Sequence, residues 1–328
     1  MAVQEIAYVE LYTRNSPAAV DYLTSSLGFT RVADSVLADR SSVLLRQGEA
    51  QLILTSGRGI WKFLDEHGDG IADIALTCDE VGATGRAAQA AGAQVCSPRS
   101  GDPVVSGFGG VCHTLLPSAD SAAPKLPSGR RWTATPGAPT RPVGRVRSLD
   151  QVALCLEGGS LAAHADFYQK AFGFTRRSTE HIDLGEQAMD SVVLSNACER
   201  AVFTLLAPDR AKDSGQLDAF LARNGGPGVQ RLAFLVEDLL AAAHDFRDRG
   251  AEFLSTPDTY FQLVAERITG MRDELLEPHG EMLQLFSRSP FERDTLFFEL
   301  VQRHGARQFG DSNLRSLYEA VERDRLTA

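Results

Sequence analysis

Two hydrophobic patterns alternate along this chain of 328 residues. Short apolar runs typical of buried strands, such as 71–77 and 229–236, each lead into an alanine-rich stretch with helical spacing. Each of these stretches ends at a glycine, Gly92 or Gly250, and glycine is the usual residue just beyond the end of a helix. The pattern therefore predicts a fold of the α+β class.

The same order of segments occurs twice. The matching pairs are VELY (9–12) with VALC (152–155), LGFTR (27–31) with FGFTR (172–176), SVLL (42–45) with SVVL (191–194), and AGAQV (91–95) with RGAEF (249–253). Four matches in one order predict an internal duplication. We expect each half to contain two βαβββ modules that pair into an open half-barrel, with helices outside and a ligand site on the inner face.

The segment between the two halves has a different composition. Residues 118–144 are rich in Pro, Ala, Ser and Gly, which is typical of a linker. The expected boundaries are therefore 1–117 for the first domain and 145–328 for the second. Near the end of the chain, residues 313–325 carry apolar side chains at helical spacing. They predict an amphipathic helix that is either exposed or a lid over the second half-barrel.

Composition narrows the class of protein. The 33 basic and 43 acidic residues give a net charge of −10, and 43% of the residues are hydrophobic. This balance excludes a disordered chain and disfavours a nucleic-acid-binding protein. No secretory signal and no apolar stretch of about 18 residues occur, so we expect a cytoplasmic protein without a membrane segment. The five scattered cysteines predict neither a disulfide framework nor a thiolate zinc site.

Several segments of the second half carry a family resemblance. The longest is TLFFELVQRHGA (295–306), and shorter ones are GGPGVQ (225–230), LQLF (283–286) and GEQAM (185–189). Through them the chain resembles 4-hydroxyphenylpyruvate dioxygenase and 4-hydroxymandelate synthase over nearly its whole length, and VALCL (152–156) looks closer to the synthase. The resemblance implies a vicinal-oxygen-chelate fold with the active site in the second half. It also implies a homodimer.

The resemblance implies the metal site of that family, in which two histidines and one carboxylate hold Fe(II). Glu299 falls at the carboxylate position, whereas Gln151 and Arg231 fall at the histidine positions. A glutamine oxygen is a weak ligand, and a guanidinium has no lone pair to donate and stays charged. We therefore expect no ordinary iron site and no cofactor. We expect instead that Arg231 and Glu299 form a buried, hydrogen-bonded charge pair in which Glu299 is ionised.

The resemblance also implies a set of substrate-binding positions. They are Ser191, Thr204, Leu206, Gln284, Phe286, Phe298 and Asn313. Leu206 stands where the dioxygenase pattern has an asparagine. The survival of a polar and aromatic pocket predicts that the protein still binds a small molecule, aromatic or acidic in character.

Three functions remain open at this point. The first is metal-independent chemistry on an aromatic or 2-oxo-acid-related molecule in specialised metabolism, by proton transfer, isomerisation, cyclisation or elimination. Arg231 would then anchor a carboxylate or oxyanion, with Glu299 as general base and Gln151 beside them. The second is a non-catalytic binding protein in which the pair is only a buried salt bridge. The third is an Fe(II) 2-oxo-acid dioxygenase with an unusual ligand set.

Overall fold

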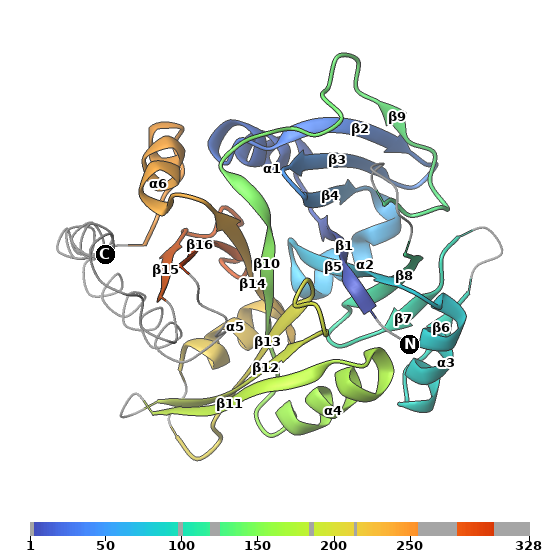
Figure 1. Cartoon of the computed structure of the whole chain (residues 1–328), viewed down its shortest axis with the longest axis vertical. Coiled ribbons are helices and arrows are strands. Elements are labelled where there is room, and N and C mark those ends of the chain that lie inside the picture. The colour runs from blue at the N-terminus through green and yellow to red at the C-terminus, as the bar shows by residue number, and fades with distance from the viewer. Residues whose placement is uncertain are drawn as a thin grey trace.

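Two β-sheets, one from each half of the chain, make up the fold (Figure 1). The computed structural model describes residues 3–97, 101–118, 125–183, 187–212, 215–254 and 281–304. The first sheet has nine strands in the order β6-β7-β8-β5-β1-β4-β3-β2-β9. The second has seven strands in the order β11-β12-β13-β10-β14-β16-β15 and curls into a half-barrel.

The elements follow one another in the same way in both halves. Those of the first half are β1 (Val3–Tyr12), α1 (Ser16–Asp21), the π-helix η1 (Tyr22–Ser26), β2 (Thr30–Val36), β3 (Ser41–Gln47), β4 (Ala50–Ser56), the 3-10 helix η2 (Arg58–Ile60), α2 (Trp61–His67), β5 (Gly70–Cys78), α3 (Val81–Ala90), β6 (Val95–Cys96), β7 (Val104–Ser106), β8 (Cys112–Pro117) and β9 (Thr133–Ala134). Those of the second half are β10 (Val146–Cys155), α4 (Leu161–Phe172), β11 (Thr175–Asp183), β12 (Ala188–Ser195), β13 (Val202–Pro208), α5 (Gln216–Asn224), β14 (Gly228–Val236), α6 (Leu239–Asp248), β15 (Glu281–Phe286) and β16 (Phe297–His304).

Strand registers confirm the predicted duplication. β1 pairs parallel with β4 and antiparallel with β5, and β10 pairs in the same two ways with β13 and β14. Val9 of β1 lies opposite residues of β4 and β5, and Val152 of β10 lies opposite the corresponding residues of β13 and β14. The segments 9–12 and 152–155, which matched in sequence, therefore occupy equivalent positions in the two sheets.

The matching glycines also have matching conformations. Gly28 and Gly173 have φ of 73° and 74°, and Gly92 and Gly250, just beyond α3 and α6, have φ of 100° and 91°. Glycine adopts these left-handed values without the steric penalty of a side chain. The chain therefore leaves a helix in the same direction at each point of the repeat.

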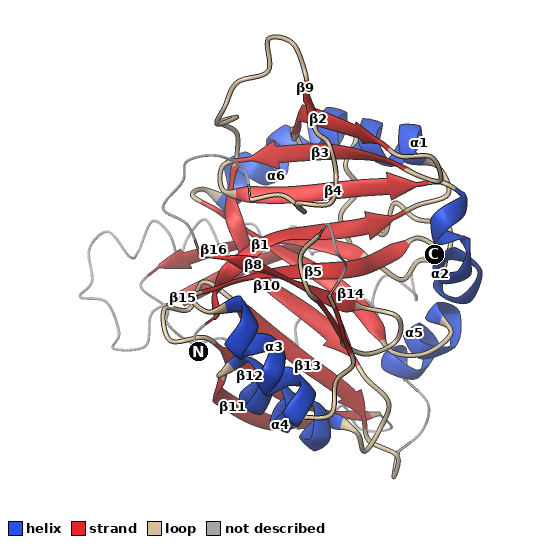
Figure 2. Cartoon of the chain, turned by 90° about the vertical axis from the view of Figure 1, so that its right-hand side faces the viewer, coloured by secondary structure: helices blue, strands red, loops and turns tan. Residues whose placement is uncertain are grey.

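One continuous hydrophobic core joins the two halves. In each sheet, one face packs against helices, and we call it the outer face. On the outer faces, side chains from β1 and β10 belong to one apolar cluster. The same cluster contains Leu23, Tyr168 and Phe246 from three different helical segments. α3 of the first half and α4 of the second lie side by side (Figure 2). The halves therefore share a core instead of enclosing two separate ones.

A buried hydrogen bond crosses this shared core. Nε2 of His113 on β8 lies 2.9 Å from the hydroxyl of Tyr168 on α4, and Nδ1 lies 3.1 Å from the carbonyl oxygen of Ile74. Because a carbonyl only accepts, Nδ1 carries the proton and Nε2 accepts from Tyr168. Burial lowers the pKa of His113 to about 4, so the ring is neutral at neutral pH. His113 is thus a connection between the halves.

The segment predicted as a linker folds over the first sheet. Its residues 125–142, here called the strap, include β9, which pairs with β2. Leu126, Trp132 and Ala138 of the strap pack on an apolar cluster that contains Tyr8 and Leu44. This cluster lies on the face opposite the shared core, which we call the inner face. The strap therefore covers the inner face of the first sheet.

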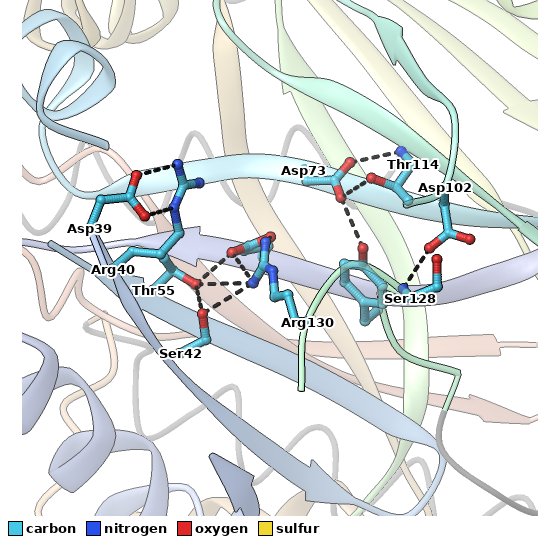
Figure 3. Close-up of polar contacts among 11 residues, drawn as sticks. Asp39, Arg40, Ser42, Thr55, Asp73, Asp102, Thr114, Ser128 and Arg130 are labelled. Atoms are coloured by element: carbon cyan, nitrogen blue, oxygen red, sulfur yellow. Dashed lines mark hydrogen bonds and ion pairs between the residues drawn. The ribbon is translucent and has the colours of Figure 1, made fainter. Parts of the chain in front are cut away.

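Arg130 fixes the strap to the sheet by a buried ion pair. Its Nη1 and Nη2 donate to the two carboxylate oxygens of Glu10, each at 2.7 Å. Thr55 also donates to Glu10, and Ser42 lies 2.7 Å from the Thr55 hydroxyl (Figure 3). Two-point binding of a carboxylate by a guanidinium is the geometry that gives strong charge-assisted hydrogen bonds.

A second polar group lies beside this pair on the same face. Asp73 accepts from the Tyr8 hydroxyl at 3.2 Å, from the Thr114 backbone N–H at 2.9 Å and from the Thr114 hydroxyl at 2.6 Å (Figure 3). Burial, and next the charge of Glu10, raise the pKa of Asp73 to about 7. The inner face of the first sheet is therefore filled by hydrogen-bonded side chains and closed by the strap.

Two further sequence predictions concern the C-terminal amphipathic helix and the lack of a membrane segment. The amphipathic helix predicted at 313–325, and its role as a lid, lie outside the described residues. Within the described ranges, no helix has the length and apolar character needed to cross a bilayer.

Candidate active site

Three strands of the half-barrel bring the predicted catalytic residues together. Gln151 on β10 lies opposite Ala233 on β14, and Ala233 lies beside Glu299 on β16. These residues form one row across neighbouring strands, which are about 4.8 Å apart. Arg231 lies two residues before Ala233 on β14 and so points to the same face. This is the inner face of the half-barrel, equivalent to the face that the strap covers in the first sheet.

Arg231 and Glu299 form a buried ion pair. Nε of Arg231 lies 3.0 Å from Oε2 of Glu299, and their side chains are 3% and 0% exposed. The N–H of Arg231 is not directed at this oxygen, and neither carboxylate oxygen accepts a hydrogen bond from the described residues. The predicted pairing is present, but the predicted hydrogen bond between the two groups is not. Both groups keep unused hydrogen-bonding capacity in a site closed to bulk water.

Glu299 is a carboxyl group set to titrate near neutral pH. Burial raises its pKa to about 7, against the opposing effect of the Arg231 guanidinium. The expected ionisation of Glu299 is therefore only partial at neutral pH, because burial outweighs the opposing effects of Arg231 and Arg303. A carboxyl with this pKa can both take up and release a proton at physiological pH.

Gln151 is oriented by a neighbouring strand. The hydroxyl of Thr204 on β13 donates to Oε1 of Gln151 at 2.9 Å, and both side chains are buried. The amide oxygen is thus engaged by a hydroxyl, and the Gln151 amide N–H₂ is the part of the side chain that can still donate. Two predicted site residues, Gln151 and Thr204, therefore act as one unit beside the ion pair.

The other predicted binding residues surround the pair to different degrees. Phe286 on β15 lies directly across from Glu299, and the centre of its ring is 5.9 Å from the guanidinium carbon of Arg231. This is the range of a cation–π contact. Gln284 points to the same face two residues away. Phe286 therefore forms an aromatic wall directly on the cation.

Ser191 and Leu206 lie further along the inner face. They pair across β12 and β13, and the Ser191 hydroxyl has no hydrogen-bond partner among the described residues. Leu206 packs against Leu217 and Phe220 of α5 in a small apolar cluster. The leucine at this position thus closes one end of the half-barrel with an apolar contact.

Phe298 does not belong to the site. It follows Phe297 and precedes Glu299 on β16, so its side chain points to the outer face. There it lies in the shared core, with ring centroids 5.8 Å from Phe234 and 6.3 Å from Tyr22. The prediction that Phe298 lines the pocket was wrong because alternation along the strand reverses its direction. Asn313 lies outside the described residues.

The sequence reasoning missed a second ion pair near Glu299. Nε and Nη2 of Arg303 on β16 donate to the two oxygens of Asp150 at 2.8 and 2.6 Å, and both side chains are largely buried. Asp150 raises the pKa of Glu299 and Arg303 lowers it. Arg303 follows Glu299 by four residues, so strand alternation places both on one face. A charged residue at that spacing in an apolar strand was the available signal.

Comparison with known proteins shows which family the chain belongs to. The model of the Glyoxalase/Bleomycin resistance protein/Dioxygenase superfamily matches residues 5–107 and 148–285. A solved structure of a triple mutant of 4-hydroxymandelate synthase from Streptomyces coelicolor is 40% identical in sequence, with a TM-score of 0.89 over 99% of this chain and 100% of that one. The chain belongs to the 4-hydroxyphenylpyruvate dioxygenase/4-hydroxymandelate synthase family. The predicted vicinal-oxygen-chelate fold is thereby confirmed.

Other members of this family are more distant in sequence. The 4-hydroxyphenylpyruvate dioxygenase of Aspergillus fumigatus is 26% identical over 97% of this chain and 91% of its own length. The enzyme of the same name from Neurospora crassa is 28% identical over 80% of this chain and 71% of its own length. This chain is therefore similar to dioxygenases of the family along most of their length.

Proposed function

We propose that this family member performs metal-independent proton-transfer chemistry on an aromatic 2-oxo acid or a closely related small molecule. Arg231 holds the carboxylate or developing oxyanion of the substrate, and Glu299 acts as the general base. The reaction classes that fit these two roles are proton transfer, isomerisation, cyclisation and elimination. Specialised metabolism is the setting that we propose for such a reaction.

The proposal is supported first by the ion pair itself. The family resemblance implies an iron held by two imidazoles and a carboxylate, but here a guanidinium lies 3.0 Å from that carboxylate. A guanidinium offers no lone pair, and its charge repels a dication. Within the described ranges, no three His, Cys, Asp or Glu side chains are grouped so that they could bind a metal. The donor set of Gln151, Arg231 and Glu299 does not fit Fe(II).

The electrostatics of Glu299 support the role of a base. Its pKa of about 7 keeps a substantial fraction of the group in each protonation state at neutral pH. A substrate anion bound to Arg231 would compete with Glu299 for the guanidinium. The carboxylate would then lose the cation that most lowers its pKa and become a stronger base. Binding and activation are coupled through the same pair.

For a 2-oxo acid the step is an enolisation. The Glu299 carboxylate takes a proton from the carbon next to the carbonyl and becomes a carboxylic acid. The electron pair of the broken C–H bond forms the new C=C bond, and the carbonyl electron pair moves to oxygen. Arg231 stabilises the resulting enolate oxygen, as a fixed positive charge does for developing negative charge in other enzymes. Phe286 provides an apolar wall for an aromatic ring.

Hydrogen exchange on a family substrate tests this proposal. The chain is incubated with 4-hydroxyphenylpyruvate in D₂O, and deuterium at the carbon next to the carbonyl is followed by NMR. We expect exchange above the buffer background, at least about 100-fold slower in Glu299→Gln, because general-base catalysis typically contributes 10²–10⁴-fold. Glu292→Gln, which changes an exposed carboxylate, serves as the control and should retain the wild-type rate.

Metal analysis decides between this proposal and its rivals. The protein is purified without chelator, its iron content is measured, and oxygen uptake with 4-hydroxyphenylpyruvate is recorded. About one iron per chain together with oxygen uptake would replace the proposal by a dioxygenase with an unusual ligand set. Stabilisation by 4-hydroxyphenylpyruvate without exchange or oxygen uptake would favour a binding protein.

A further inference from the structure

A large cleft lies between the two halves, and neither Arg231 nor Glu299 is among the residues that line it. It has a volume of about 770 Å³, within the range of small-molecule sites. Its walls come from β1, the β3–β4 hairpin, the strap, the start of β10, the β12–β13 loop and the end of β14. Apolar side chains, including Ile6, Leu52 and Leu149, form part of the lining. The cleft therefore offers both volume and an apolar wall.

The charged residues of the cleft are unequally paired. Five cations (Arg46, Lys125, Arg141, Arg147 and Arg200) and four acids (Glu5, Glu49, Asp150 and Glu199) line it. Three of the acids are already in ion pairs: Glu5 with Lys125 and Arg200, Asp150 with Arg303, and Glu199 with Arg177. Arg147 pairs with Glu237 outside the cleft. Among the described residues, Arg46 and Arg141 are the lining cations without an ion pair.

Arg46 is the unusual member of this set. It is 5% exposed, its Nη1 donates to the carbonyl oxygen of Thr140 at 2.8 Å, and its Nε has no hydrogen-bond partner in the described part of the chain. A buried guanidinium N–H without an acceptor is costly. An acceptor brought by a ligand would remove this cost. Two charges act on Arg46: first the Glu49 carboxylate, and next Arg141, which adds a second positive charge to the site.

We propose that this cleft binds a small organic anion, with an oxyanion group on Arg46 and Arg141 and an apolar body against Ile6, Leu52 and Leu149. Guanidinium groups bind phosphate and carboxylate groups strongly because their N–H donors match the acceptor oxygens. Glu49, on the same wall, opposes the anion by its negative charge. The site is separate from the proposed proton-transfer site and does not depend on that proposal.

Calorimetric titration with phenyl phosphate, inorganic phosphate and benzoate in a low-salt chloride buffer tests the site. We expect saturable binding of at least one organic anion and weaker binding of inorganic phosphate. Tighter binding of phenyl phosphate identifies a phosphate group, and tighter binding of benzoate identifies a carboxylate. No saturable binding of either organic anion, or inorganic phosphate binding as tightly as both, would overturn the proposal.

Charge variants assign the site to its residues. Arg46→Gln should weaken binding about tenfold or more, and Arg141→Gln about threefold, because a buried charge contact contributes more than an exposed one. Glu49→Gln should tighten binding about threefold, a gain that loss of folding does not produce. Arg86→Gln, an exposed change on α3 outside the cleft, should leave the affinity unchanged.

The set remains decisive if one variant is unstable. If Arg46→Gln does not fold, the opposite effects of Arg141→Gln and Glu49→Gln carry the test. Wild-type affinity in folded Arg46→Gln, or no change in both of the other cleft variants, would place any observed binding elsewhere and overturn the assignment.

Discussion

The inner faces of the two sheets carry different polar groups at equivalent positions. By strand register, Tyr8 corresponds to Gln151 and Asp73 to Arg231. Asp73 pairs with Cys112, and Arg231 pairs with Phe297. Thr114 follows Cys112 by two residues and Glu299 follows Phe297 by two, so Thr114 corresponds to Glu299. In the first sheet Asp73 accepts three hydrogen bonds from the other two residues. In the second, Glu299 accepts none from the described residues.

This difference separates a structural cluster from a candidate site. A buried polar group that is fully hydrogen-bonded contributes to stability and specificity, whereas one left unsatisfied raises the free energy of the folded state. The first sheet satisfies Asp73 through Tyr8 and Thr114 and adds Arg130 from the strap to neutralise Glu10. The second holds a cation and a carboxyl with polar atoms that have no hydrogen-bond partner among the described residues. Unused hydrogen-bonding capacity, not charge alone, thus distinguishes the Arg231–Glu299 pair from the Asp73 cluster.

The largest effect should come from rebuilding the family's ligand set in the half-barrel. Gln151→His with Arg231→His places two imidazoles beside Glu299 on strands that already bring these positions together. We expect Fe(II) binding with a dissociation constant of about 1 μM, equivalent to about 8 kcal/mol. Anaerobic titration measures it. Recovery of oxidative decarboxylation is less direct, because surrounding groups also tune a metal site.

Each single change is a control for this restoration. Gln151→His leaves the guanidinium in place, and Arg231→His leaves one imidazole and an amide, so both should bind iron far more weakly. The corresponding double change in the first sheet, Tyr8→His with Asp73→His, should bind none, because Thr114 replaces the carboxylate. A folded Gln151→His/Arg231→His protein that binds no iron would show that the three positions do not converge.

The next effect concerns the two ion pairs. Arg130→Leu leaves Glu10 buried opposite no cation and should lower the free energy of unfolding by about 3–5 kcal/mol. Arg231→Leu should lower it by only about 1–3 kcal/mol, because Glu299 can take up a proton near pH 7. Urea denaturation at pH 7 compares them. Arg131→Leu, an exposed neighbour of Arg130, is the control.

If Arg130→Leu and Arg231→Leu lower the free energy of unfolding equally, the two inner faces do not differ in the way proposed. An unchanged midpoint for Arg231→Leu would mean that this arginine and Glu299 are not a buried pair.

The third effect is a pH dependence shared by both faces. Glu299 and Asp73 each have a pKa raised to about 7, from 4.5 and 3.8. A raised pKa favours the protonated folded state. Its stabilisation is fully present below about pH 4 and is lost as the pH rises through about 7, by about 3 kcal/mol for Glu299. Glu299→Gln and Asp73→Asn, which mimic the protonated forms, should therefore gain stability relative to the wild type between pH 4 and 8. Differences that stay constant over this range would show that these carboxyls do not titrate there.

The smallest effect tests the orientation of Gln151. Thr204→Val removes the hydroxyl that donates to the amide oxygen and should cost about 1–2 kcal/mol of stability, because the buried oxygen loses its donor. Thermal denaturation at fixed pH measures it. Thr204→Ser keeps the hydroxyl and should lose less. If valine and serine have the same effect, the hydroxyl does not support Gln151.

The sequence predicted the duplication because repeated segments are a local pattern. Gln151, Arg231 and Glu299 were predicted through the family resemblance, and the strand registers then placed them on one face. Phe298 was misplaced because the resemblance was carried over without applying the two-residue alternation of strands. The ion pairs of Arg130 and Arg303 were missed because they join residues 120 and 153 positions apart. The cytoplasmic location and the homodimer stay predictions.

The hydrogen bond from Tyr168 to His113 has a consequence for how such a duplicated protein can change. The two halves carry different polar groups on their inner faces, yet each contributes side chains to one interior. We expect that neither half can be moved alone into another protein, because its apolar outer face would then be exposed to water. We therefore expect substitutions to be tolerated better on the inner faces than where the two halves touch. Recombination that exchanges only one copy between relatives should fail unless both sides of this junction are exchanged together.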